Sequence, residues 1–89
     1  MPYVNSESRD RFRVALNSVR AAIGAACTPG DLNYVLTKVA LAYVEARGEN
    51  YTHINDVLGA LEGAKQEFYR RVAVPYENQK IVENGDVYL

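Results

Sequence analysis

The sequence predicts an all-α fold of three main helices and a C-terminal segment, within a single domain over residues 1–89. Apolar residues recur at three- and four-residue spacing through most of the chain, which is the period of an amphipathic helix. Breaks around Pro29, Gly48 and Pro75 divide this pattern, and Gly and Pro mark the ends of helices. We therefore expect helices over about 6–27, 31–47 and 52–74, followed by a segment over 75–89.

The first helix is expected to begin after a hydroxyl cap at Ser6 or Ser8. It should end at Thr28-Pro29-Gly30, because the residue before a proline avoids helical dihedral angles and glycine frees the turn. The apolar face of this helix is predicted to consist of Phe12, Leu16, Val19, Ile23 and Ala26.

The second helix is expected to start at Asp31, or with Pro29 at its first position. Arg47-Gly48 is a typical end, since a cation lies near the carboxyl terminus of the helix and glycine can adopt a left-handed conformation. The predicted apolar face consists of Leu32, Val35, Leu36, Val39, Ala42 and Tyr43.

The third helix is predicted to be the longest, from a cap at Thr52 to at least Val72. Pro75 should break or kink it, because proline lacks a backbone donor and clashes with the preceding turn. A short helix over about 76–83 can follow, and Asn84-Gly85 then turns the chain. The apolar stripe of the third helix is predicted to consist of Ile54, Val57, Leu58, Leu61, Phe68 and Val72.

The last quarter of the chain is unusually aromatic for a terminal segment, since solvated tails are usually poor in such residues. It mixes Phe68, Tyr69, Tyr76 and Tyr88 with cations and carboxylates. We expect this segment to dock, with Val87, Tyr88 and Leu89 buried against the same chain or against a neighbour.

The amino-acid composition favours a homo-oligomer. Large apolar side chains are few, with seven Leu, three Ile, two Phe and no Trp against eleven Ala and eleven Val. Small side chains bury less surface, at roughly 25 cal/mol per Å² of apolar area, so a lone three-helix unit would be only marginally stable. A twofold dimer is the simplest assembly that adds the missing contacts.

Charge and cysteine content limit the classes of function. The net charge is −1, and the only dense basic stretch is diluted by Glu7 and Asp10, so nucleic acid is not a favoured partner. A single Cys27 excludes an intrachain disulfide and fits a reducing compartment. Since no membrane span or signal peptide is visible, a cytoplasmic protein is expected. The basic stretch consists of Arg9, Arg11, Arg13 and Arg20.

Catalysis has little support in the sequence. The lone His53 stands at a helix start, where a surface or capping role fits better than a general base. Cys27 lies beside a helix carboxyl end, where the helix dipole does not favour a thiolate. One His and one Cys cannot build a zinc site unaided. We therefore expect a non-enzymatic protein without metal or cofactor.

Two rows of polar residues border the predicted apolar faces. Asn55, Gly59, Glu62, Gln66 and Tyr69 fall at three- and four-residue steps on the third helix, and Asn33 and Thr37 form a shorter row on the second. Such rows can frame a ligand pocket, and glycine would let a flat ligand approach the backbone. An ordinary solvated face has the same pattern and is the simpler interpretation.

Arg70 and Arg71 beside Tyr69 form the best candidate site for an anion. Guanidinium groups bind phosphate or carboxylate bidentately, and tyrosine can stack on a base. The structural alternative is that the arginines lie near a helix carboxyl end and pair with Glu67 or Glu77. The full set of candidate ligand-binding residues is Arg70, Arg71, Tyr69, Tyr76, Asn55, Glu62, Asn33, Lys65 and Tyr88, with Lys80 as a further cation.

The chain resembles a family of small uncharacterised proteins from tailed phages and prophage-like regions of bacterial genomes. The resemblance spans nearly the full length and rests on Met1-Pro2-Tyr3-Val4, Gly30-Asp31-Leu32-Asn33-Tyr34-Val35, Glu67-Phe68-Tyr69-Arg70-Arg71-Val72, Pro75-Tyr76-Glu77, Lys80-Ile81 and Glu83-Asn84-Gly85-Asp86-Val87-Tyr88. It implies a free-standing protein of phage or mobile-element type in the host cytoplasm. It implies no reaction and no catalytic residues.

Small helical phage proteins without catalytic groups often act by binding. The resemblance therefore implies a non-enzymatic binding protein, for example an anti-defence protein that sequesters an anionic, nucleotide-derived signal. The alternative is a regulator or inhibitor that contacts a host protein, or less readily DNA, through the arginine-rich first helix.

Overall fold

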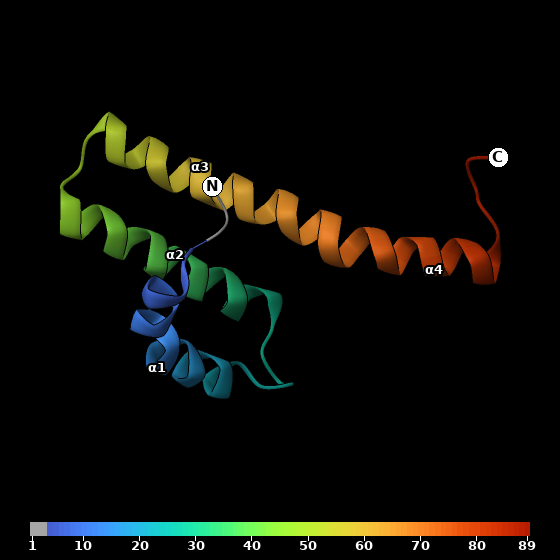
Figure 1. Ribbon diagram of the computed structural model, residues 1–89, viewed down its shortest axis with the longest axis horizontal. Helices are drawn as coiled ribbons and strands as arrows, with labels where there is room; N and C mark the ends of the chain where they lie inside the picture. The colour runs from blue at the N-terminus through green and yellow to red at the C-terminus, as the bar shows by residue number, and fades with distance from the viewer. Residues whose placement is uncertain (1–3) are drawn as a thin grey trace. The chain divides into compact units, whose positions relative to one another are not determined.

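The computed structural model describes residues 4–89, so Met1, Pro2 and Tyr3 of the opening motif lie outside the described part (Figure 1). Within it the chain is helical and contains no strand. The all-α class, with three main helices and a long third one, is confirmed. The elements are α1 (Ser6–Ile23), α2 (Pro29–Arg47), α3 (Tyr51–Phe68), a π-helical segment (Tyr69–Ala73) and α4 (Val74–Asn84).

The chain divides into two compact units, residues 4–57 and residues 58–89, and each is described by itself. In the first unit, α1 begins after Asn5, whose side-chain oxygen accepts a hydrogen bond from the backbone N–H of Ser8 at 2.9 Å. The prediction that Ser6 or Ser8 caps this helix was therefore wrong, and asparagine is an equally strong cap. The helix ends at Ile23 rather than at residue 27, because Gly24 takes a positive φ of 53°.

A capping box starts α2. The Thr28 hydroxyl accepts from the Asp31 N–H at 3.1 Å, and the Asp31 carboxylate accepts from the Thr28 N–H at 3.0 Å. Pro29 is then the first helical residue, which is the second of the two starts expected from the sequence. The helix ends at Gly48, where φ is 98° and the N–H donates to the Val44 carbonyl at 2.7 Å, as the Arg47-Gly48 pair predicted.

The cap of α3 lies two residues before the position predicted from the sequence. Asn50, and not Thr52, accepts the capping hydrogen bond, which comes from the His53 N–H at 2.9 Å. Thr52 already lies inside the helix. Asn ranks above Thr among N-cap residues, and its side-chain oxygen accepts from a free N–H of the first turn.

In the second unit the helix continues through Pro75, so of the two effects expected of this proline, a break or a kink, the break does not occur (Figure 1). The π-helical segment explains this continuity. The Val74 N–H bonds to the Tyr69 carbonyl five residues back, which widens the turn just ahead of the proline ring. The ring then lies in the first turn of α4, where its missing donor is tolerated. The helix ends at Gly85, with φ 87°.

None of the residues from 4 to 89 is fully buried in the single chain. In the first unit Val19, Ile23 and Val35 are half-buried where α1 meets α2. In the second unit the apolar stripe stays open, with Leu58 60%, Phe68 65% and Val72 51% exposed. The apolar faces predicted from spacing exist as helix faces, yet the single chain does not close them into a core.

The C-terminal segment is not buried against its own chain. Val87, Tyr88 and Leu89 are 92%, 94% and 103% exposed. Of the two docking partners expected from the sequence, the chain itself is thus excluded for these side chains, and burial against a neighbour stays a prediction.

Candidate functional site

The arginine pair predicted as an anion site lies on the π-helical segment. Arg70 grips Glu67 with two hydrogen bonds, from Nη2 to Oε2 at 2.8 Å and from Nε to Oε1 at 3.3 Å. This hydrogen bonding, with the nearby charge of Arg71, holds the pKa of Glu67 below its ordinary value. Arg70 is therefore already engaged by a carboxylate of its own chain, as the structural alternative supposed.

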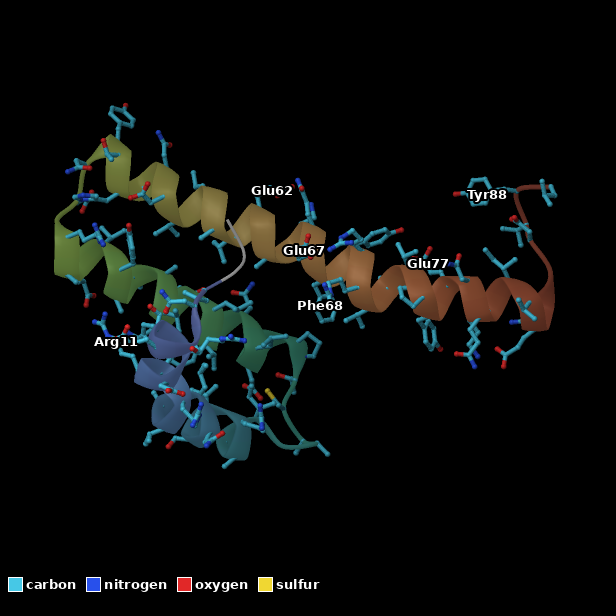
Figure 2. The ribbon with its side chains drawn as sticks, in the orientation of Figure 1. Arg11, Glu62, Glu67, Phe68, Glu77 and Tyr88 are labelled. Atoms are coloured by element: carbon cyan, nitrogen blue, oxygen red, sulfur yellow. The ribbon has the colours of Figure 1, made fainter. Side chains whose placement is uncertain are left out.

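Tyr69 is likewise engaged within the chain. Its hydroxyl donates to Glu77 Oε2 at 3.4 Å, which links the π-helical segment to α4. This hydrogen bond and the carboxylate charge raise the pKa of Tyr69. Figure 2 shows Glu67 and Glu77 on one side of the helix and Phe68 on the other.

The second unit also contains a groove between α4 and the C-terminal segment. Its volume is about 320 Å³, and it brings together Tyr76, Lys80 and Tyr88. The Lys80 ammonium lies 5.4 Å from the centre of the Tyr76 ring and 3.2 Å from a carboxylate oxygen of Glu83. Glu77 and Asp86 line the same groove, and their negative charge opposes the binding of an anion.

Two members of the polar row on the third helix, Glu62 and Gln66, pair with each other. Gln66 donates to Glu62 at 3.1 Å, and Lys65 lies 3.9 Å from the same carboxylate, all at exposed positions. The row therefore has the contacts of a solvated helix face, with pairs three and four residues apart.

Asn33 and Asn55 belong to the first unit, whereas the other candidate residues belong to the second. The Thr37 hydroxyl donates to the Asn33 carbonyl at 2.8 Å and approaches the Asn33 side chain at 3.4 Å. This polar row, too, is satisfied within its own helix.

A polar contact that the sequence did not predict joins α2 to α3. The Tyr43 hydroxyl donates to Asp56 Oδ2 at 2.8 Å, and this bond raises the pKa of Tyr43. The Arg47 guanidinium lies 4.8 Å from the centre of the Tyr43 ring, and His53 Nδ1 lies 2.8 Å from the Gly48 carbonyl oxygen. These contacts fix the turn between the two helices, and His53 serves there rather than beside a nucleophile.

A second groove, of about 450 Å³, lies on α1 and was not predicted. It combines the apolar residues Val4, Phe12 and Leu16 with three of the arginines that the sequence showed as a basic stretch. Spacing assigned Phe12 and Leu16 to the core, but they are 49% and 58% exposed. The three arginines of this α1 groove are Arg9, Arg13 and Arg20.

No helix in the described part of the chain is long and apolar enough to cross a membrane. Among residues 4–89, His, Cys, Asp and Glu side chains form no cluster of three that could hold a metal ion.

These features define a small all-helical protein whose described ion pairs join residues three positions apart and whose apolar side chains remain accessible. Residues 1–87 match a protein family described as a domain of unknown function (DUF6899), and the chain belongs to that family. No curated protein and no solved structure matches it.

Proposed function

We propose that this protein is a non-enzymatic binding protein that acts through protein–protein contact as a homo-oligomer. One observation carries the proposal: 48% of the residues are hydrophobic, yet none of residues 4–89 is buried in the single chain. Exposed apolar surface of this extent is typical of a protein that buries it against another surface. A second copy is the simplest partner, because it supplies the same surface at the same concentration.

The stripe on the long helix is the first candidate for this contact. It consists of Leu58, Leu61, Phe68 and Val72, which are spaced by three, seven and four residues. Such spacing keeps side chains on one helix face, and two such faces can interlock as in a coiled coil. Glu62 and Glu67 fall between these positions in the sequence and pair with Lys65 and Arg70, each three residues further along.

Variants of the stripe test this proposal by equilibrium unfolding in urea at several protein concentrations. For a homo-oligomer the urea concentration at the midpoint of unfolding rises with protein concentration, because association stabilises the folded state. Phe68→Asp should weaken association roughly ten- to hundred-fold, since burial of a large apolar side chain contributes about 1.5–3 kcal/mol. Gln66→Glu, on the solvated face, is the matched control. A midpoint independent of concentration in the wild-type protein would contradict the proposal.

A second candidate function is favoured by the groove that contains Tyr76, Lys80 and Tyr88. In this proposal the protein is of phage type, acts in the cytoplasm of the infected cell and sequesters an anionic, nucleotide-derived signal. Lys80 would meet the charge and a tyrosine would stack on the base. The proposal ranks second because Arg70 is paired with Glu67 and because Glu77 and Asp86 line the groove.

A thermal-shift screen with cyclic and linear nucleotides tests this second candidate. A binding nucleotide raises the melting temperature, and Lys80→Ala should weaken its binding some ten- to hundred-fold if a charge-assisted bond of about 1.5–3 kcal/mol is lost. Lys65→Ala, on the solvated face of α3, is the control. Absence of any shift at millimolar nucleotide would remove the candidate and leave the oligomer proposal untouched.

A further inference from the structure

We propose that residues 83–89 of one copy dock in the α1 groove of a second copy. This inference rests on the proposed self-association and specifies one of its contacts. It pairs the most exposed apolar segment among residues 4–89 with a groove of opposite charge.

The α1 groove combines apolar walls with a cationic rim. Val4, Phe12 and Leu16 provide the apolar surface, at 55%, 49% and 58% exposure. None of its lining residues is acidic among those that the structure describes. Arg13 pairs with Asp10 beside the groove, whereas no ion pair of Arg9 or Arg20 is seen within residues 4–89. The arginines therefore carry positive charge to the edge of an apolar depression.

Residues 83–89 have the complementary composition. Glu83 and Asp86 are acidic and the segment itself contains no basic residue, while Lys80 of α4 pairs with Glu83 at 3.2 Å. Val87, Tyr88 and Leu89 are at least 92% exposed. A tyrosine and two aliphatic side chains suit a groove of about 450 Å³, which falls within the size range of small ligand sites. Opposite charges on the two surfaces favour this orientation and disfavour contact between two like surfaces.

The segment is also held in a defined turn. The Tyr88 N–H donates to the Asp86 side chain at 2.9 Å, and the Leu89 N–H donates to the Asp86 carbonyl at 3.3 Å. Asp86 therefore fixes the chain after the Gly85 helix end, and the segment turns back so that Tyr88 lies to the side of α4 (Figure 2). A pre-formed turn loses less conformational entropy on binding than a free tail does.

A second copy is the occupant that the observations favour. Neither the groove nor the segment is buried in the single chain, and both are present on every copy. If the first copy docks its segment in the second and the second docks its own in the first, the contact closes into a twofold dimer with two identical junctions. Each junction then buries Tyr88 among Phe12, Leu16 and the arginines.

Sedimentation equilibrium of full-length variants tests the inference. Tyr88→Ala and the double variant Arg9→Glu/Arg20→Glu should each raise the dissociation constant of the oligomer at least ten-fold. Val14→Ala is the matched control, because Val14 is 79% exposed on α1 but does not line the groove. It should change the dissociation constant less than two-fold.

A charge exchange makes the test specific for this contact. Arg20→Glu and Glu83→Lys should each weaken association, and the variant that carries both should recover at least part of the loss, since opposite charges again face each other. Circular dichroism of every variant checks that the helices are retained. Recovery in the double variant supports the docking, and additive weakening overturns it.

The outcomes separate this inference from the proposed function. An oligomeric wild-type protein whose dissociation constant is unchanged by Tyr88→Ala and Arg9→Glu/Arg20→Glu overturns the docking and leaves the oligomer proposal intact. A monomeric wild-type protein overturns both. Binding of a labelled DNA duplex that is lost in Arg9→Glu/Arg20→Glu, with the oligomer unchanged, assigns the groove to nucleic acid and also overturns the docking.

Discussion

At the scale of single residues, the charged and polar groups of this chain are satisfied mainly by neighbours three or four positions away. Lys65 lies beside Glu62, Arg70 binds Glu67 and Lys80 binds Glu83. Such exposed pairs contribute little to stability, because water screens them and each long side chain loses freedom. Their effect is instead to determine which charged side chains remain available to bind a ligand or a second protein.

The bond between Arg70 and Glu67 can be checked by its effect on titration. Arg70→Gln should raise the pKa of Glu67 towards its ordinary value of 4.5, because the main cause of the lowered pKa is then lost. In the wild-type protein the folded pKa lies below the unfolded one, so this contribution to stability is present above the unfolded pKa and is lost as pH falls through the folded pKa.

Carboxyl-detected NMR titration measures this pKa directly. Lys80→Gln is a suitable control, since Lys80 binds Glu83 and should leave the pKa of Glu67 unchanged. An unchanged Glu67 pKa in Arg70→Gln would show that the pair does not persist in solution.

The caps offer a second prediction at this scale. Asn50→Ala should lower the free energy of unfolding by about 0.5–2 kcal/mol, because the His53 N–H loses its acceptor. Thr52→Ala, inside the first turn, should stay within about 0.5 kcal/mol of wild type. Urea unfolding at one fixed protein concentration compares the two, and a larger loss for Thr52→Ala would restore the cap expected from the sequence.

At the scale of elements, the helix spacing and the Gly and Pro positions were sufficient to predict three helices and most of their ends. The exact cap residues were harder to predict, because each helix start offers more than one suitable residue within a few positions. These are Asn5, Ser6 and Ser8 for α1, and Asn50 and Thr52 for α3. The continuation through Pro75 depends on a π-helical turn, which has no clear local sequence signal.

Two glycines of the second unit should respond differently to substitution by alanine. An added Cβ at Gly59 would meet no atom within 4 Å, so Gly59→Ala should stabilise the helix by about 0.5–1 kcal/mol. Gly85 has φ 87°, so Gly85→Ala should be destabilising. Thermal unfolding measures both, and a destabilising Gly59→Ala would indicate that another surface packs closely against this position.

The candidate site was only partly predictable, for reasons that lie in the same elements. Tyr76, Lys80 and Tyr88 are brought to one groove, but the sequence could not show that Glu77 and Asp86 would line it as well. The sequence predicted Arg70 either as a ligand group or as a partner of Glu67, and the structure shows the two hydrogen bonds to Glu67. The α1 groove escaped detection because spacing marks Phe12 and Leu16 as apolar without saying what covers them.

At the scale of the whole molecule, the composition and the structure lead to the same expectation by different routes. The composition offers few large apolar side chains for a core, and the structure leaves those of the long helix exposed. Burial of such side chains contributes about 1.5–3 kcal/mol each, which is a large part of the stability of a small domain. Self-association is the central claim because it would supply this burial.

Sedimentation equilibrium of the wild-type protein at micromolar concentration tests this claim most directly. The account predicts a mass of at least twice the 9.9 kDa of one chain, falling towards 9.9 kDa on dilution. A single species of 9.9 kDa at every concentration up to the millimolar range would contradict it.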